Sequence, residues 1–166
     1  MMAFFGIIGT LLGIILFGFI VNAVEDYHKQ NNRVNMSFKE AMDLANLPVV
    51  TFYNNNKKIN FLLDTGSNQS QINKSVLASL DYKMLDEKSQ VTGIEGFYRD
   101  VEYCTMKILY KNQEFNNEFC VCELQDAFDL VKKETGVTIH GILGSQFFQK
   151  YKYILDFESL IAYSNK

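Results

Sequence analysis

The sequence predicts a mostly β domain with a few short helices, preceded by one apolar helix long enough to cross a membrane. Short runs of β-branched and aromatic residues recur after residue 48 and are separated by turn-forming polar residues. One of these runs leads directly into an acidic, glycine-containing turn at Asp64. Residues 3–24 carry no charged side chain, and about 22 residues at about 1.5 Å each can span a hydrocarbon core of about 30 Å.

The length of the chain sets its domain organisation. The 166 residues leave room for one domain of about 120 residues after the N-terminal segments. We therefore expect a transmembrane helix at 3–24, a polar tether with a short helix at 25–46 and a single folded domain at 47–166. The net charge of −3 and the lack of a Lys/Arg block argue against a nucleic-acid partner, which requires a basic patch.

The apolar segment at 3–24 is interpreted as a single-pass membrane anchor. A cleaved signal peptide is the alternative, because small residues at 21–23 resemble a cleavage site. Two features favour the anchor. No Lys or Arg precedes the apolar run, and the run is longer than the usual signal-peptide core of about 7 to 15 residues.

Charged residues near the span predict its orientation. Lys29, Arg33 and Lys39 all follow the span, and the positive-inside rule then places the folded domain in the cytoplasm. Within the span, Gly9 and Gly13 have the spacing that lets two membrane helices approach closely.

The folded part begins with a helix and a hairpin. Ser37 and Glu40 have the spacing of a capping box, so we expect a helix from Ser37 to about Ala45, closed by Asn46 and Pro48. Strands at 49–53 and 59–63 follow, and a polar connection at 54–58 joins them.

Later elements are predicted from the same patterns. They are an extended segment at 70–72, a short helix capped by Asn73 and running to about Leu80, strands at 103–110 and 118–122, a helix at 126–134 ending near Gly136, and an apolar strand at 137–141.

The tetrapeptide Asp64-Thr65-Gly66-Ser67 is the strongest functional signal. It places a carboxylate where a buried strand ends, with the Thr65 hydroxyl beside it. Gly66 lets the backbone turn sharply and approach the carboxylate, because glycine has no Cβ. By itself the string also fits a plain Asp/Gly turn at the end of a strand.

A second motif, Ile142-Leu143-Gly144-Ser145, lies downstream and is followed by an aromatic-rich segment at 147–157. Together the two motifs resemble the retropepsin-like family of aspartic peptidases over roughly residues 47–163. The resemblance implies a closed β-barrel, equivalent to half of an acid protease, in which Gly144 lets two chain segments cross closely. It also implies that Asp156 lies in a structural turn before a last strand at 160–163.

The resemblance extends to the substrate side of the site. Residues 91–98 look like the flap of that family, so Gly93, Ile94, Glu95 and Gly96, with Ser67, would contact substrate. Glu95 departs from the small or apolar residue expected there, and a plain β-turn between Val91 and Val101 is the alternative.

The implied activity is that of an aspartic endopeptidase with Asp64, Thr65 and Gly66 as catalytic residues. One such loop makes half an active site, so the resemblance implies a homodimer in which two Asp64 carboxylates share a proton and activate water. No cofactor or metal is needed. A non-catalytic retropepsin-like module that binds a peptide or pairs membrane helices is the main alternative, and a β-barrel adaptor with a chance motif is a third.

The cysteines are predicted to be structural. Cys120 and Cys122 would lie on one face of a strand. A zinc site usually needs four ligands, and only His28 and His140 could supplement the thiols. His140 precedes Gly141 in the apolar strand and has no feature of a catalytic base.

Overall fold

The computed structural model describes residues 36–92 and 98–164, and its side chains outside 87–100. The predicted membrane span at 3–24 and the flap residues Gly93, Ile94, Glu95 and Gly96 therefore lie outside the described residues. Within the described part of the chain, no helix is long and apolar enough to cross a membrane.

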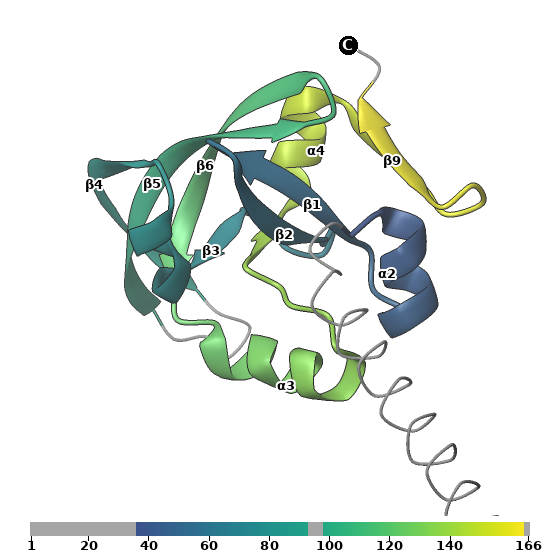
Figure 1. Ribbon diagram of the computed structural model, residues 1–166. Helices are drawn as coiled ribbons and strands as arrows, with labels where there is room; N and C mark the ends of the chain where they lie inside the picture. The colour runs from purple at the N-terminus through teal and green to yellow at the C-terminus, as the bar shows by residue number, and fades with distance from the viewer. Residues whose placement is uncertain (1–35, 93–97, 165–166) are drawn as a thin grey trace, which may run out of the picture. The chain divides into compact units, whose positions relative to one another are not determined.

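Six strands form a closed barrel (Figure 1). The strand order is β1-β2-β7-β3-β6-β5-β4, and β1 also pairs with β5 through Tyr53 and Leu109, which closes the ring and leaves β4 attached to β5 outside it. The closed barrel agrees with the predicted fold class. The strands are β1 Val49–Asn54, β2 Lys57–Leu63, β3 Gln71–Asn73, β4 Lys83–Thr92, β5 Tyr98–Tyr110, β6 Gln113–Cys122 and β7 Gly141–Leu143.

The hairpin between β1 and β2 is tighter than predicted. Its two loop residues, Asn55 and Asn56, both have positive φ, 44° and 66°. Such turns match the right-handed twist of paired strands and favour Asn, which tolerates the left-handed region. The flanking residues Asn54 and Lys57 pair with each other, so most of the expected connection at 54–58 belongs to the strands.

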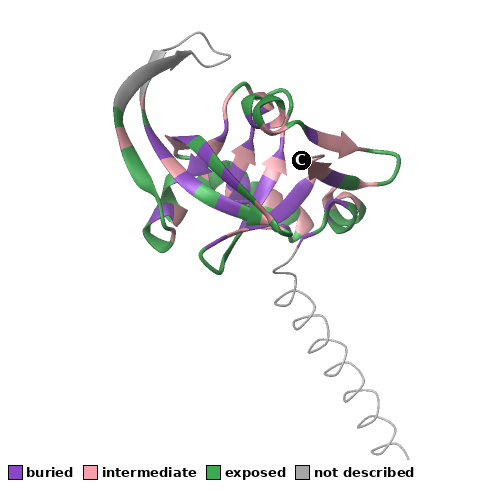
Figure 2. Cartoon of the chain, turned by 90° about the horizontal axis from the view of Figure 1, so that it is seen from above, coloured by how far each residue is buried: buried purple, intermediate pink, exposed green. Residues whose placement is uncertain are grey.

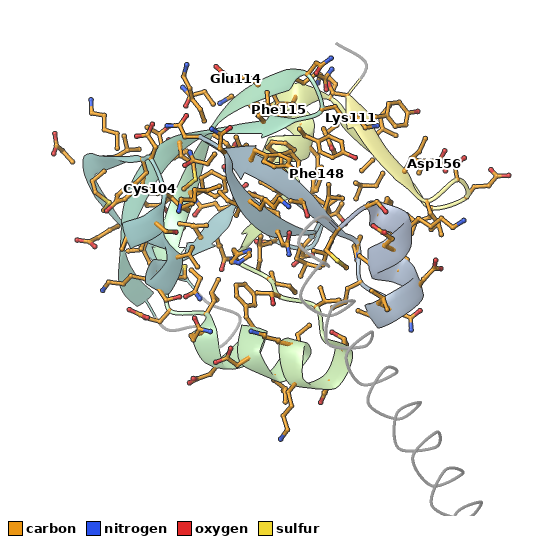
Figure 3. All side chains as sticks on the ribbon, in the orientation of Figure 1. Cys104, Lys111, Glu114, Phe115, Phe148 and Asp156 are labelled. Carbon is orange, nitrogen blue, oxygen red and sulfur yellow. The ribbon has the colours of Figure 1, made fainter. Side chains whose placement is uncertain are left out.

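Aromatic side chains fill the barrel. Phe52 contacts Phe61, Phe115 and Phe147 with ring centroids 5.8 to 6.2 Å apart and near-perpendicular planes, an arrangement that aromatic pairs prefer. Figure 3 labels Phe115, and Figure 2 shows buried stretches along the barrel strands, with exposed residues on helices and turns. The interior is therefore a packed core.

The two longer helices have the caps that the sequence predicts. In α2 (Phe38–Ala45), Ser37 Oγ accepts from the Glu40 N–H and the Glu40 carboxylate accepts from the Ser37 N–H. In α3 (Gln125–Thr135), Gly136 ends the helix with φ 75°. Both helices contribute to a second buried cluster, which consists of Met36, Ala41, Val49, Phe128, Val137 and Ile139.

Two local predictions were wrong. The helix after Asn73 is a 3-10 helix, η1 (Lys74–Ser79), and the Asn73 side chain does not cap it. Instead Asn73 donates to Gln125 and accepts from the Leu124 N–H, joining β3 to the start of α3. Residues 137–140 are also not a strand.

The chain ends in a short helix and a separate hairpin. Helix α4 (Ser145–Tyr151) is followed by β8 (Tyr153–Asp156) and β9 (Ile161–Ser164), which pair with each other. In the turn, Asp156 Oδ1 accepts from the Glu158 and Ser159 N–H groups at 2.9 and 3.0 Å (Figure 3). The bonds from Ser159 and then Glu158 hold the pKa of Asp156 below its usual value. Asp156 is thus structural, as predicted.

We expect Tyr153→Phe to stabilise the fold. Among the described residues, the Tyr153 hydroxyl is buried without a hydrogen-bond partner, and an unsatisfied buried polar group is unfavourable by about 1 to 3 kcal/mol. Its removal should raise the free energy of unfolding, measured by urea denaturation, by about 1 kcal/mol. The control is Tyr151→Phe, which loses a bond to the Asn116 carbonyl and should lower stability. A Tyr153→Phe protein less stable than the wild type would contradict this expectation.

Candidate active site

Asp64 lies at the point where two parallel strands end together. Its own strand β2 pairs with β7 through Leu63 and Leu143. The Asp64 N–H then donates to the Leu143 carbonyl at 3.0 Å. This bond continues the ladder by one residue and holds the Asp64 backbone at the edge of the barrel, while its side chain is half-buried.

The turn that follows orients the carboxylate. The Gly66 N–H donates to Asp64 Oδ1 at 2.9 Å, and a Cβ on Gly66 would lie 3.2 Å from the same oxygen. That distance is shorter than most Cβ contacts, so a residue larger than glycine would require the Asp64 side chain to shift. Thr65 and Gly66 are exposed, which leaves the turn accessible to a ligand or a second chain.

The crossing predicted at Gly144 is present. A Cβ there would lie 2.5 Å from the Gln69 carbonyl oxygen and 2.8 Å from that of Ser67, so any other residue would have to displace backbone. The Ser145 N–H donates to Ser67 O at 2.7 Å and the Gln146 N–H to Asn68 O at 3.2 Å. These N–H groups begin α4 and have no partner within it, so the loop carbonyls cap the helix while the helix supports the loop.

Gly141 is a close contact that sequence reasoning did not assign. A Cβ there would lie 2.5 Å from the Gln71 carbonyl oxygen and 2.8 Å from the Phe61 ring. Gly141 pairs with Phe61 of β2 on one side and with Ile72 of β3 on the other. A glycine inside a short apolar strand is a signal for such an approach.

Side chains behind the turn form a hydrogen-bonded network. The Ser67 hydroxyl donates to the Gln69 carbonyl at 2.8 Å and accepts from Gln71 Nε2 at 3.3 Å. From β5, the Tyr103 hydroxyl donates to Gln69 Oε1 at 2.9 Å. Ser67 therefore stabilises the loop through these bonds. Its contact with substrate stays a prediction. The sequence did not point to Gln69 or Tyr103, because only the strand register brings them together.

The segment predicted to be the flap lies between strands β4 and β5 in the chain. Strands β4 and β5 pair up to Thr92 and Tyr98, and β5 is the strand that carries Tyr103. The same strand thus connects the Asp64 loop to the base of the hairpin. The substrate contacts predicted for Gly93, Ile94, Glu95 and Gly96 concern residues outside the described part of the chain.

His140 joins β7 to the strand that carries Asp64. Its ring Nδ1 accepts from the Asn60 backbone N–H at 2.9 Å, and the His140 backbone N–H donates to the Asn60 carbonyl at 2.9 Å. Asn60 Nδ2 also donates to the Thr138 carbonyl at 2.8 Å. These bonds pair the Thr138 carbonyl and the His140 backbone N–H with Asn60 outside any strand ladder, and the observed strand begins only at Gly141.

We expect the fold to lose stability as the pH falls below the ordinary histidine range. Burial, followed by the charge of Lys132, lowers the pKa of His140 from 6.5, so the folded state favours the neutral ring whose Nδ1 can accept. The unfolded chain takes up the proton more readily, and the contribution to stability is complete above about pH 6.5 and is lost as the pH falls through the lowered pKa.

Urea denaturation across this pH range measures the effect. The His140→Asn variant, whose amide oxygen does not titrate there, should show a shallower decline in unfolding free energy between pH 7.5 and 5 than the wild type. Parallel declines in the two proteins would assign the pH dependence to other groups.

Comparison with known proteins identifies the class that this fold and site define. A family model described as aspartyl protease matches residues 50–147, which is more than half of the chain and includes both the Asp64 turn and Gly144. The chain belongs to the retropepsin-like aspartyl protease family.

Solved structures are also similar to the chain. The chain is similar to the EIAV protease complexed with the inhibitor HBY-793, with 18% identity, a TM-score of 0.47 and coverage of 67% of this chain and 93% of that one. It is also similar to the retroviral protease-like domain of Ddi1 from Leishmania major, with 12% identity, a TM-score of 0.48 and coverage of 72% and 89%. No curated protein matches the chain.

Proposed function

We propose that this protein is a membrane-anchored aspartic endopeptidase, active as a homodimer to which each chain contributes one Asp64. The observation that carries the proposal is the placement of Asp64. A half-buried carboxylate stands at the end of β2, one of its oxygens accepts from the Gly66 N–H, and the exposed turn beside it is supported from behind by Gly144 and α4.

Two such turns brought together would form one catalytic site. Ionisation of both carboxylates at close range is unfavourable because the two negative charges repel each other. The pair therefore holds one proton and titrates as a unit. The ionised carboxylate takes a proton from a bound water, which attacks the peptide carbonyl, and the protonated carboxyl donates to the developing oxyanion. In this scheme Thr65 and Gly66 hold each carboxylate in place.

The substrate class is an extended peptide or protein segment. The β4–β5 hairpin would cover it, with Gly93, Ile94, Glu95 and Gly96 at the tip and Ser67 on the opposite side. An extended peptide is recognised through its main-chain groups and alternating side-chain pockets, and a closing flap excludes water from the reaction.

A mixed peptide library incubated with the full-length protein tests the activity and reports cleavage sites. The main alternative is a module of the same fold that binds peptides or pairs membrane helices without hydrolysis. Binding of library peptides without any cleavage, at every pH from 3 to 8, would favour that alternative.

We expect the specific activity to fall on dilution. Each chain supplies one Asp64, and a closed two-fold pairing is the simplest way to juxtapose two of them. Activity and molecular mass should be measured over the same dilution series, and the loss of activity should follow the appearance of the monomer. Constant specific activity in samples that contain only monomer would exclude the shared site.

The membrane anchor is a proposal that rests on the uncharged segment at 3–24. A span confines two half-sites to one plane and so raises their effective concentration, and Gly9 and Gly13 would let the two helices pair. The positive-inside rule places the catalytic domain in the cytoplasm. Retention of the full chain in carbonate-washed membranes supports the anchor, and recovery of a mature chain that begins after residue 23 would exclude it.

A further inference from the structure

Two cysteine side chains lie in contact on the face of β6 that points away from the aromatic core. Cys120 and Cys122 are two residues apart on β6, and their Sγ atoms are 3.3 Å apart. Neither is in a disulfide. The shared face was predicted from the strand spacing, but the contact between the sulfur atoms was not.

The third cysteine points the other way. Cys104 is 0% exposed and belongs to the aromatic core of the barrel with Phe119, its partner across the β5–β6 ladder. Because neighbouring residues on a strand point to opposite faces, Cys120 and its partner Tyr103 lie on the outer side. The chain therefore separates the thiol in the aromatic core from a pair on the opposite face of β6, where Cys120 is itself buried and Cys122 is partly exposed. Figure 3 labels Cys104 on β5.

The Cys120–Cys122 pair is adjacent to the hydrogen-bonded network that Ser67, Gln69, Gln71 and Tyr103 form next to the Asp64 turn. Cys120 is the register partner of Gln71 on β3 and of Tyr103 on β5. Gln71 donates to Ser67, and Tyr103 donates to Gln69. A change in the backbone at Cys120 would thus reach two side chains that hold the catalytic loop.

The two thiols have different roles in exchange chemistry. The hydrogen bond with Cys122, together with burial, raises the pKa of Cys120, so Cys120 keeps its proton. Cys122 is less buried, and a thiolate there would accept a hydrogen bond from the Cys120 thiol. Cys122 is therefore the thiol placed to attack first, because it is the more accessible of the two to a dissolved disulfide.

We propose that Cys120 and Cys122 form a dithiol modification site that a low-molecular-weight disulfide, such as oxidised glutathione, converts reversibly into an intrachain disulfide. The Cys122 thiolate attacks one sulfur of oxidised glutathione and releases one glutathione thiolate, which takes up the proton of Cys120. The Cys120 thiolate then attacks the Cys122 sulfur and releases the second glutathione. Two protein thiols are oxidised, and one glutathione disulfide is reduced to two thiols.

Closing this bond would alter the end of β6. The sulfur atoms must move from 3.3 Å to about 2.05 Å. Residues two apart on an extended strand have Cα atoms about 6.6 to 6.8 Å apart, which is the upper limit for a disulfide at about 6.8 Å. Because most disulfides have Cα atoms about 5.5 to 6 Å apart, the bond favours a contraction of the strand between Cys120 and Cys122. Their register partners Gln71 and Asn73 form the ends of β3, the strand that follows the catalytic loop.

Trypsin digestion provides a direct test, because cleavage after lysine and arginine separates Cys104 from the other two cysteines. Peptide 100–107 contains only Cys104, and peptide 112–132 contains both Cys120 and Cys122. Full-length protein is incubated with oxidised glutathione, denatured, alkylated and digested. We expect peptide 112–132 to be unalkylated and lighter by two hydrogens, while peptide 100–107 is alkylated.

The matched controls are Cys122→Ser and Cys104→Ser. The first should abolish the mass loss in peptide 112–132 and the second should leave it unchanged. Alkylation of both cysteines in peptide 112–132, or a disulfide that links it to peptide 100–107, would overturn the proposal.

The effect on catalysis rests on the proposed peptidase activity and is measured separately. Oxidised wild-type protein should lose activity and regain it with dithiothreitol, whereas Cys122→Ser should be insensitive to oxidised glutathione. Full activity in protein whose mass shows the disulfide would refute the coupling to the catalytic loop. If the protein hydrolyses no peptide in either state, the mass measurement still decides whether the disulfide forms.

Discussion

Asp64→Asn should abolish peptide hydrolysis while leaving the barrel folded. An amide can still accept the 2.9 Å bond from the Gly66 N–H, so the turn keeps its geometry. The amide can neither take a proton from water nor share one with the second chain, and general acid–base catalysis contributes about 10²- to 10⁴-fold. Because both half-sites carry the substitution, we expect a loss at the upper end of this range, measured as kcat/KM on a cleaved library peptide.

Asp156→Asn is the matched control for this experiment. It makes the same chemical change in a carboxylate that accepts two backbone N–H groups in a turn, and an amide oxygen can accept the same bonds. Its activity should remain close to that of the wild type. Hydrolysis that survives in Asp64→Asn, or that is lost equally in both variants, would contradict the assignment of Asp64.

Gly144→Ala should have the second large effect, on both stability and activity. Its Cβ would lie 2.5 Å from the Gln69 carbonyl oxygen and 2.6 Å from the Gln69 carbonyl carbon. Backbone cannot rotate away as a side chain can, so the loop and the β7–α4 junction must separate. Overpacking of this kind lowers stability by about 1 to 3 kcal/mol, occasionally more, and we expect about 3 kcal/mol by urea denaturation.

The same separation removes support from the catalytic loop. The Ser145 and Gln146 N–H groups would lose their bonds to Ser67 and Asn68, so peptidase activity should fall even under conditions where the variant is fully folded. Gly136→Ala is the control, because Gly136 has φ 75° at an exposed helix end and alanine there is unfavourable by about 1 to 2 kcal/mol through backbone strain alone. Equal effects of the two substitutions would argue against the crossing.

Local structure was largely predictable because its determinants lie within a few residues. The Ser37–Glu40 capping box begins α2, and Gly136 ends α3. The Asp64 turn closes through a bond between residues two apart in the chain. Each feature depends on a backbone conformation that a particular side chain, or the lack of one, favours locally. The polar run between the first two strands predicted the turn, although the strands extend further into it.

Elements whose backbone groups find distant partners were predicted less well. Asn73 had the residue type of a helix cap, but its side chain bonds Gln125, which is 52 residues away. The apolar segment at 137–140 had the composition of a strand, but His140 and Thr138 bond the Asn60 backbone and side chain. In both cases a long-range partner replaced the local one.

By itself, the sequence determined that a carboxylate follows a buried strand, that glycine follows it in the turn, and that an apolar-apolar-glycine motif lies downstream. These are properties of residue type and short-range order. Only the tertiary structure decided that Gly141 passes close to Gln71 and Phe61, that Tyr103 contacts Gln69, and that Cys120 lies between Gln71 and Tyr103. Closure of the barrel sets the register between strands that are far apart in sequence. This register determines which side chains meet, and no short stretch of sequence contains it.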